Sequence, residues 1–219
     1  MNGVCAVLLA AGLGSRYREQ AGAAQDKLLA SCSGRDGSQR PVLEHAVRAL
    51  HGSVERLLLV TRPDNTGVLT LARRLDLEVL TLASAGMGDS LAAAIRHSAD
   101  SRGWLIALGD MPFIQPDTVA LVVAALEHDS LVAPTFRGRR GHPVGFGNLH
   151  GLALAQLTGE HGARALLKER PLRELPVDDP GVLWDVDTPA GLVLAQQLAG
   201  GRLDVDPCAQ SGRYKGARC

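Results

Sequence analysis

The chain has 219 residues, of which 46% are hydrophobic and only 3% aromatic, and its 23 lysines and arginines balance its 23 aspartates and glutamates. A net charge of zero supplies no basic field for non-specific binding to nucleic acid, and so few aromatic side chains supply no stacking surface for single strands. No apolar run approaches the ~20 residues that cross a bilayer, and no basic segment precedes the first apolar run. We therefore expect a cytoplasmic protein that has neither nucleic acid nor a membrane as a partner.

Length and composition predict one α/β domain over residues 1–199, followed by a mobile tail at 200–219. The tail is expected to be mobile because apolar residues become sparse after Val205. The four cysteines lie far apart and form no Cys-x-x-Cys pair. This spacing argues against both a zinc site and a disulfide framework.

Apolar runs typical of buried strands alternate with helix-like stretches in the first part of the chain. We predict strands at 4–9, 56–61, 78–82 and 104–108, and helices at 41–51, 64–75, 86–96 and 116–128. Such alternation builds a mostly parallel sheet that is covered by helices. The second part is less regular, with strands predicted at 130–136, 143–146 and 172–177 and helices at 151–158 and 162–169. Two polar stretches without periodicity, 17–26 and 31–40, are predicted to be loops.

A glycine turn follows the first strand. Gly12 and Gly14 let the backbone turn tightly, so that its N–H groups can point at an anion, and Arg16 and Lys27 add positive charge nearby. The pattern predicts a phosphate-binding turn. The alternative is an ordinary strand-to-helix connection, which also uses glycine.

Asp110 directly follows the apolar run at 104–108 and Gly109. A carboxylate at the carboxyl end of a sheet strand lies where open α/β sheets bind their ligands. Together with a phosphate-binding turn it indicates a Mg²⁺–nucleotide site, because Mg²⁺ is held by one or two carboxylates and the phosphates of the substrate. The alternative is that Asp110 only forms a turn before Met111-Pro112.

A set of short motifs follows in order along roughly residues 4–198. They are Leu9-Ala-Ala-Gly-Leu-Gly-Ser-Arg16, Lys27-Leu-Leu29, Pro41-Val-Leu43, Gly86-Met-Gly-Asp-Ser-Leu91, Leu108-Gly-Asp-Met-Pro112, Gly141-His-Pro-Val144, Gly162-Ala-Arg164 and Asp185-Val-Asp-Thr-Pro189. On this ordered set the chain resembles the molybdenum cofactor nucleotidyltransferases, most closely their cytidylyltransferase (MocA-like) branch, which is related to the MobA-type guanylyltransferases.

The resemblance implies a Rossmann-like nucleotide-diphospho-sugar transferase fold, in which a mostly parallel sheet with one antiparallel strand carries helices on both faces. It also implies a Mg²⁺-dependent enzyme that transfers CMP from CTP to the phosphate of molybdopterin and releases pyrophosphate. Ala10-Ala11 favours CTP over GTP, because the guanylyltransferases more often have Ala-Gly-Gly there. A molybdenum hydroxylase of the xanthine dehydrogenase type is the implied protein partner.

The resemblance also assigns roles to residues. Arg16, Lys27 and Asp110 are expected to be catalytic, and Asp110 and Asp187 to bind the metal. The residues expected to bind the nucleotide are Leu9, Ala10, Ala11, Gly12, Gly14, Arg16, Lys27, Gly86 and Ser90. His142 and Arg164, the latter expected at the head of a helix, are the candidates for binding the acceptor.

Local structure offers alternatives for several of these residues. In Asp185-Val186-Asp187 the alternation of an extended chain puts both carboxylates on one side, with Asp187 as ligand and Asp185 as its support. Asp187 or Thr188 could instead cap the helix that begins at Pro189. Similarly, Ser90 could be a helix cap and His142 an ordinary loop histidine.

The chain departs from the family in two places. Arg16 and Lys27 are farther apart than is usual, and the segment between Leu29 and Pro41 is longer. The first insertion leaves open whether Arg16 or Arg18 meets the phosphates.

Two other functions remain open. The enzyme could use GTP, or another phosphorylated metabolite such as a sugar or polyol phosphate, because the same groups serve any such transfer. The protein could also be a non-catalytic accessory factor that binds the cofactor for a molybdenum hydroxylase.

Overall fold

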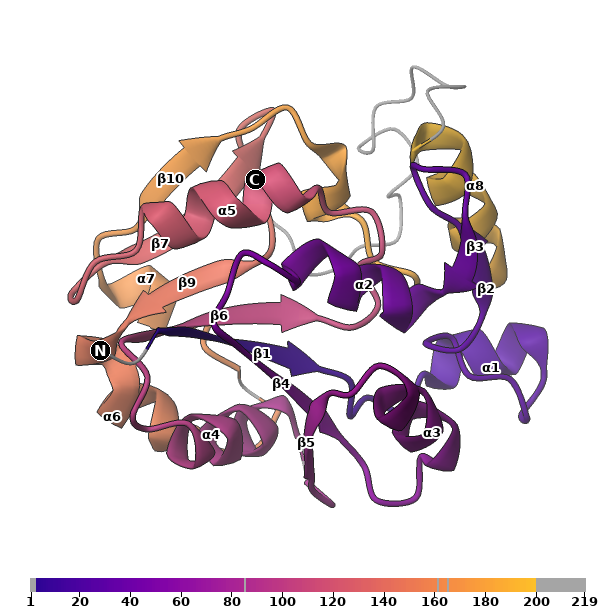
Figure 1. Ribbon diagram of the computed structural model, residues 1–219, viewed down its shortest axis with the longest axis horizontal. Helices are drawn as coiled ribbons and strands as arrows, with labels where there is room; N and C mark the ends of the chain where they lie inside the picture. The colour runs from indigo at the N-terminus through magenta and orange to yellow at the C-terminus, as the bar shows by residue number, and fades with distance from the viewer. Residues whose placement is uncertain (1–2, 85, 161, 165, 200–219) are drawn as a thin grey trace.

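The computed structural model describes residues 3–84, 86–160, 162–164 and 166–199 (Figure 1). Within these residues one eight-stranded sheet has the order β10-β7-β9-β6-β1-β4-β5, with β8 paired to β7. The strands are β1 (Val4–Leu9), β4 (Arg56–Thr61), β5 (Glu78–Thr81), β6 (Gly103–Leu108), β7 (Leu131–Phe136), β8 (Arg139–Arg140), β9 (Val144–Gly147) and β10 (Arg173–Pro176). The strand at 4–9 and its neighbours are therefore confirmed.

The sheet is mostly parallel, as expected, and β9 is the antiparallel strand. β1 runs parallel to β4 and β6, whereas β9 runs antiparallel to both β6 and β7. The two-residue β8 adds a second, short antiparallel pairing to β7. Positive φ values at Arg137 and Gly138 build the tight turn between β7 and β8, because two such residues in succession match the twist of a hairpin.

Helices cover both faces of the sheet, as expected (Figure 1). One face carries α2 (Val42–Leu50), α3 (Thr66–Arg74) and α5 (Pro116–Ala124); the other carries α4 (Met87–His97), α6 (Gly151–Ala155) and α7 (Leu166–Glu169). In β1, Ala6 and Leu8 pack toward the first set of helices and Cys5 and Val7 toward the second. Burial on both faces explains why β1 reads as an unbroken apolar run.

The two segments predicted as loops contain regular structure, so that prediction was wrong in part. α1 (Ser15–Ala21) occupies much of the first, and β2 (Ser31–Ser33) and β3 (Gln39–Pro41) form a hairpin in the second. Cys32 of the hairpin and Tyr17 of α1 are buried in a third apolar cluster. Packing rather than a periodic sequence therefore stabilises these short elements.

Figure 1 shows α1, the β2–β3 hairpin and α8 (Pro189–Ala199) gathered beyond the carboxyl ends of β1 and β6. Two short 3₁₀ helices, η1 (Asn148–His150) and η2 (Pro180–Leu183), complete the described elements. No helix in the described part of the chain is long and apolar enough to cross a membrane. The predicted tail at 200–219 lies outside the described residues.

Candidate active site

Three carboxylates meet at the carboxyl end of the sheet. Asp110 follows β6, and Asp185 and Asp187 lie between η2 and α8. Each offers one oxygen, and these oxygens all lie within 4.8 Å of one another, so we call the three residues the acid cluster. The N–H of Val186 donates to the Asp110 carbonyl at 2.9 Å, and the Val186 side chain is fully buried. With Val186 directed into the core, its two acidic neighbours share the opposite side of the extended chain.

Two cations contact the acid cluster, and both were singled out by the sequence. Lys27 Nζ lies 2.6 Å from Asp110 Oδ2 and 3.4 Å from Asp187 Oδ1. Arg16 Nη1 donates to Asp187 Oδ2 at 2.9 Å. Arg16 therefore contacts the acid cluster directly, whereas Arg18 lies near the charge of Asp64; which of the two meets the phosphates stays a prediction.

The lysine and the arginine have different environments. The Lys27 side chain is only 13% exposed, whereas that of Arg16 is 74% exposed. Burial of the ammonium acts to lower the pKa of Lys27, but the charges and hydrogen bonds of Asp110 and Asp187 outweigh it and raise the pKa above its ordinary value. Lys27 is therefore a charged group that is fixed within the cluster at neutral pH.

The glycine turn begins at a fixed point on the sheet. The N–H of Gly109 donates to the Leu9 carbonyl at 2.9 Å, and the N–H of Ala10 donates to the Val60 carbonyl at 2.8 Å. A β-carbon on Gly109 would lie 3.3 Å from the β-carbon of Ala10. The start of the turn therefore lies against the end of β6, directly before the acid cluster.

The far end of the turn lies over the lysine. Gly14 has a φ of 61°, a left-handed conformation that favours glycine, and a β-carbon there would lie 3.7 Å from Lys27 Cγ. Between these ends, Ala11 is half-buried and Gly12 is exposed with open space around its Cα. The structure thus brings the predicted phosphate-binding turn and Lys27 together.

The acid cluster has the donor chemistry of a site for a divalent cation. Carboxylate oxygens are the protein ligands that Mg²⁺ prefers, and the ion completes its shell with water and substrate oxygens. Lys27 contacts two of the three carboxylates and Arg16 contacts one. Asp110, Asp185 and Asp187 are therefore the residues that could hold a divalent cation.

The segment expected to contact the nucleotide base is packed tightly. The buried Ser90 hydroxyl lies 2.7 Å from that of Ser84 and does not cap α4. A β-carbon on Gly86 would lie 2.3 Å from the Gly159 carbonyl oxygen, so this position requires glycine. The Gly159 N–H in turn donates to Asp89 Oδ2 at 3.0 Å. The segment is thereby joined to the chain around Gly159, which precedes Arg164, one of the two residues expected to bind the acceptor.

His142 precedes β9 at the end of the sheet where Asp110 lies, and its peptide bond to Pro143 is cis. Its N–H donates to the Val182 carbonyl at 2.9 Å. Its buried Nδ1 has no hydrogen-bond partner among the described residues. Burial lowers the pKa of His142, against the opposing effects of the Ile106 backbone and the charge of Asp110. A neutral imidazole with an unused nitrogen is therefore available.

Arg164 is exposed and lies two positions before Leu166, where α7 begins, and the Leu167 N–H donates to the Ala163 carbonyl at 3.3 Å. Arg164 therefore lies near the amino end of this helix, as expected. A β-carbon on Gly162 would lie 3.0 Å from the Met87 sulfur, so this segment packs on the start of α4. Arg164 thus remains near the predicted nucleotide segment in the fold.

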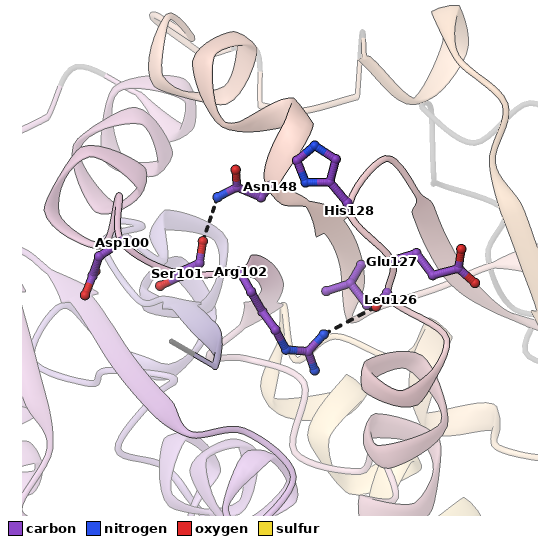
Figure 2. A pocket seen from close by; sticks show the side chains of 7 residues that line it. All are labelled: Asp100, Ser101, Arg102, Leu126, Glu127, His128 and Asn148. Carbon is purple, nitrogen blue, oxygen red and sulfur yellow. Dashed lines mark hydrogen bonds between the residues drawn. The ribbon is translucent and has the colours of Figure 1, made fainter. Parts of the chain in front are cut away.

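A shallow cavity of about 660 Å³ lies at the opposite end of the sheet (Figure 2). It is lined by Asp100, Ser101, Arg102, Leu126, Glu127, His128 and Asn148. In Figure 2 the Asn148 amide donates to the Ser101 carbonyl at 2.7 Å, and Arg102 donates to the Leu126 carbonyl at 3.4 Å. The cavity borders the amino end of β6, about 20 Å of strand away from Asp110. Ligands of open α/β sheets bind at the other end, where the acid cluster lies.

Sequence reasoning missed several residues around the site. It treated Asp185 as a support, whereas the structure places this carboxylate on equal terms with the other two. It overlooked the hydrogen bond between Asn65 and Asp26 and the ion pair between Arg35 and Asp179. Asn65 could have been found as the helix cap that precedes α3; the pairing of Arg35 and Asp179 gives no local signal.

Comparison with known proteins identifies the family. A family model described as a MobA-like NTP transferase domain matches residues 6–175. The chain is 32% identical over 169 residues to a phosphoenolpyruvate guanylyltransferase of Sphaerobacter thermophilus, covering 73% of this chain and 77% of that protein. It is 29% identical over 155 residues to the purine catabolism protein PucB of Bacillus subtilis, covering 64% of this chain and 75% of that protein.

Solved structures agree on the fold. A nucleotidyl transferase from Methanothermobacter thermautotrophicus superposes with a TM-score of 0.75 at 21% identity, covering 91% of this chain and 98% of that chain. The manganese complex of Rv0371c from Mycobacterium tuberculosis H37Rv superposes with a TM-score of 0.69 at 22% identity, covering 90% and 98%. The chain belongs to the MobA-like NTP transferase family and is a nucleotidyltransferase.

Proposed function

We propose that the protein transfers CMP from CTP to the phosphate of molybdopterin in a Mg²⁺-dependent reaction. The observation that carries this proposal is the meeting of Lys27 with Asp110 and Asp187 beside the glycine turn. A turn for phosphates, a buried cation and a cluster of carboxylates are the parts that a nucleotidyl transfer needs. The ordered motifs that resemble the cytidylyltransferase branch support CTP and molybdopterin as substrates.

In the proposed reaction an oxygen of the acceptor phosphate attacks the α-phosphorus of CTP in line. A new P–O bond forms, the bond from the α-phosphorus to the bridging oxygen breaks, and pyrophosphate leaves with that oxygen. The acceptor oxygen is already ionised, so no general base is required. The protein contributes by positioning the reactants and by neutralising the charge that develops on the leaving group.

The acids and the cations of the site would have different roles in this reaction. Asp110, Asp185 and Asp187 would hold Mg²⁺, which supplies positive charge at the α-phosphate. Lys27 and Arg16 would bind the β- and γ-phosphates. Because both cations contact the acids, they lie within one side-chain length of any phosphate that reaches the cluster.

The acceptor would bind on the side of His142 and Arg164. His142 offers a buried Nδ1 without a partner among the described residues, which suits a hydrogen bond to a polar ligand. Arg164 is exposed and positively charged, which suits a phosphate. Gly86 and Ser90, joined to the chain around Gly159, would border the base and ribose of the nucleotide.

An activity panel of nucleotides against acceptors tests the proposal. Pyrophosphate release is measured with CTP or GTP, with and without molybdopterin, at saturating Mg²⁺. We expect CTP with molybdopterin to be used best, with a preference over GTP of at least ~10-fold in kcat/KM, equivalent to ~1.4 kcal/mol. Equal use of both nucleotides, or a preference for GTP, would place the chain on another branch of the family. No turnover with any pair would indicate a non-catalytic accessory protein.

A second candidate is guanylyl transfer to another phosphorylated metabolite. It is favoured by the 32% identity to a phosphoenolpyruvate guanylyltransferase. The same panel includes GTP with phosphoenolpyruvate and with sugar or polyol phosphates. Turnover of GTP with one of these acceptors, and none with molybdopterin, would favour this candidate.

A product that carries molybdopterin would be passed on to an enzyme that uses it, for which a molybdenum hydroxylase of the xanthine dehydrogenase type is proposed. The 29% identity to a protein named for purine catabolism supports this partner. Co-purification of the two proteins, with and without CTP and molybdopterin, tests it.

A further inference from the structure

Lys27 lies on a short turn whose shape is set by its neighbour Asp26. The Asp26 Oδ1 accepts the Leu28 N–H at 2.9 Å, and the Asp26 carbonyl accepts the Leu29 N–H at 3.0 Å. This is a turn in which an aspartate side chain replaces a backbone acceptor. It fixes the local conformation of the lysine but not its place in the protein.

Asn65 attaches that turn to α3. Its Nδ2 donates to the second carboxylate oxygen of Asp26 at 2.8 Å. Its Oδ1 accepts the Val68 N–H at 3.2 Å and so caps the first turn of α3. One amide therefore makes two bonds that differ in purpose, one within the helix and one to the segment that carries Lys27.

Steric contact and backbone bonds hold the turn in the same place. A β-carbon on Gly67 would lie 2.4 Å from Leu29 Cδ1, so α3 and the turn are in close contact. On the other side, the Leu43 N–H donates to the Leu28 carbonyl at 3.0 Å. The turn is therefore held between the amino ends of α3 and α2.

We propose that Asn65 and Asp26 are positioning residues that hold Lys27 in reach of the acid cluster. The inference rests on the proposed function only for its effect on activity; its effect on the burial of Lys27 follows from the geometry alone. Neither residue contacts the acid cluster in the bonds described above, so each acts through the lysine. Without the bond between them, the lysine segment would lose its lateral attachment to α3.

The substitution Asn65→Ser separates the two bonds of Asn65. A serine at this position keeps an oxygen that can cap α3 but has no amide to reach Asp26. We expect kcat/KM to fall ~10-fold, because a misplaced catalytic group costs rate even when the fold is kept. The matched control is Asn148→Ser, which removes the bond to the Ser101 carbonyl at the opposite end of the sheet. This control is expected to retain full kcat/KM.

The decisive variant exchanges the two side chains. In the double variant Asp26→Asn/Asn65→Asp, the amide at position 26 can donate to the carboxylate at position 65, while its oxygen still accepts the Leu28 N–H. The carboxylate at position 65 still has an oxygen for the Val68 N–H. The three side-chain bonds of positions 26 and 65 are restored, with the donor of the bond between them reversed, so we expect kcat/KM to recover to within about threefold, whereas each single exchange leaves one bond broken.

A readout apart from activity is the rate at which Lys27 is acylated by an amine-reactive reagent. The chain has only three lysines, so each can be followed by mass spectrometry. Lys27 is 13% exposed and is expected to react slowly; Asn65→Ser should speed its reaction ~5-fold or more, and the double variant should slow it again. If Asn65→Ser does not fold, Asn65→Thr is used in its place.

The outcomes distinguish this proposal from the proposed function. Changed acylation of Lys27 with no nucleotidyl transfer in any variant would support the positioning role and reject the function. Unchanged acylation and unchanged kcat/KM in Asn65→Ser would overturn the positioning role. A double variant no better than the single exchanges would overturn it as well.

Discussion

The acids of the candidate site and Arg16 are held in place differently. Asp110 and Asp187 are tied to each other through the buried Val186, whose N–H binds the Asp110 carbonyl. Arg16, on the basic side, belongs to a seven-residue helix that buries only Tyr17, and its side chain is 74% exposed. The acids are thus held in place by the core before any ligand arrives, whereas the arginine can adapt to its ligand.

Asp179 stabilises the segments that lead to the acid cluster. This carboxylate is 1% exposed and accepts from the Gln115 N–H, the Thr118 hydroxyl, the Gly181 N–H and Arg35. It thereby joins the start of α5, the chain that leads to Asp185, and the β2–β3 hairpin. The comparison teaches that rigidity in this site is concentrated where a metal would bind.

Loss of an acid should have the largest effect. Asp110→Ala should lower nucleotidyl transfer at least ~100-fold, about 2.7 kcal/mol in the barrier, because a proposed ligand of the metal is removed while the fold persists. Turnover is measured at saturating Mg²⁺, with Asp129→Ala as a control at the far end of the sheet. Near wild-type turnover of Asp110→Ala would contradict the assignment of Asp110 to the metal site.

Removing a hydrogen-bond acceptor of the buried Asp179 should mainly reduce the thermal stability of the fold. Asp179→Asn replaces one acceptor oxygen by a donor, which leaves a buried donor without its partner and costs about 2 kcal/mol. For a chain of this size we expect Tm to fall by about 4–8 °C. The neighbouring, exposed Asp178→Asn is the control and should leave Tm unchanged. Equal Tm values for both variants would show that the acidic side does not depend on Asp179.

On the basic side, Arg16→Ala should raise the KM for the nucleotide ~10-fold, about 1.4 kcal/mol, and leave Tm unchanged. The side chain is largely exposed, so its removal costs little packing. Arg73→Ala, an exposed arginine of α3, is the control. A large drop in Tm would contradict the view that this side is adaptable.

The same contrast explains what the sequence could predict. Strands such as β1 and β6 are buried on both faces, so each is a continuous apolar run that stands out, and Asp110 is found at the end of one. Lys27 and Arg16 were found because they follow a glycine turn. Functional residues that are marked by a local sequence pattern could therefore be predicted.

Features that depend on contacts between residues far apart in the chain could not be predicted from the sequence. The β2–β3 hairpin has three-residue strands, too short for a periodic pattern, and owes its place to the burial of Cys32. Arg35 and Asp179 pair across 144 positions of sequence, and no local motif marks either one.

The smallest effect concerns the glycine turn itself and the choice of nucleotide. Ala11 is half-buried in the turn, and Ala11→Gly removes only one methyl group from the proposed pyrimidine pocket. A methyl group in a pocket contributes roughly 1 kcal/mol to discrimination, so we expect the CTP preference to relax by a few-fold and not to invert. The measurement is kcat/KM for CTP and GTP at saturating Mg²⁺ and molybdopterin. Ala24→Gly, in the exposed loop after α1, controls for added backbone freedom. An unchanged ratio in Ala11→Gly would separate the turn from base selection and leave that role to the segment around Gly86 and Ser90.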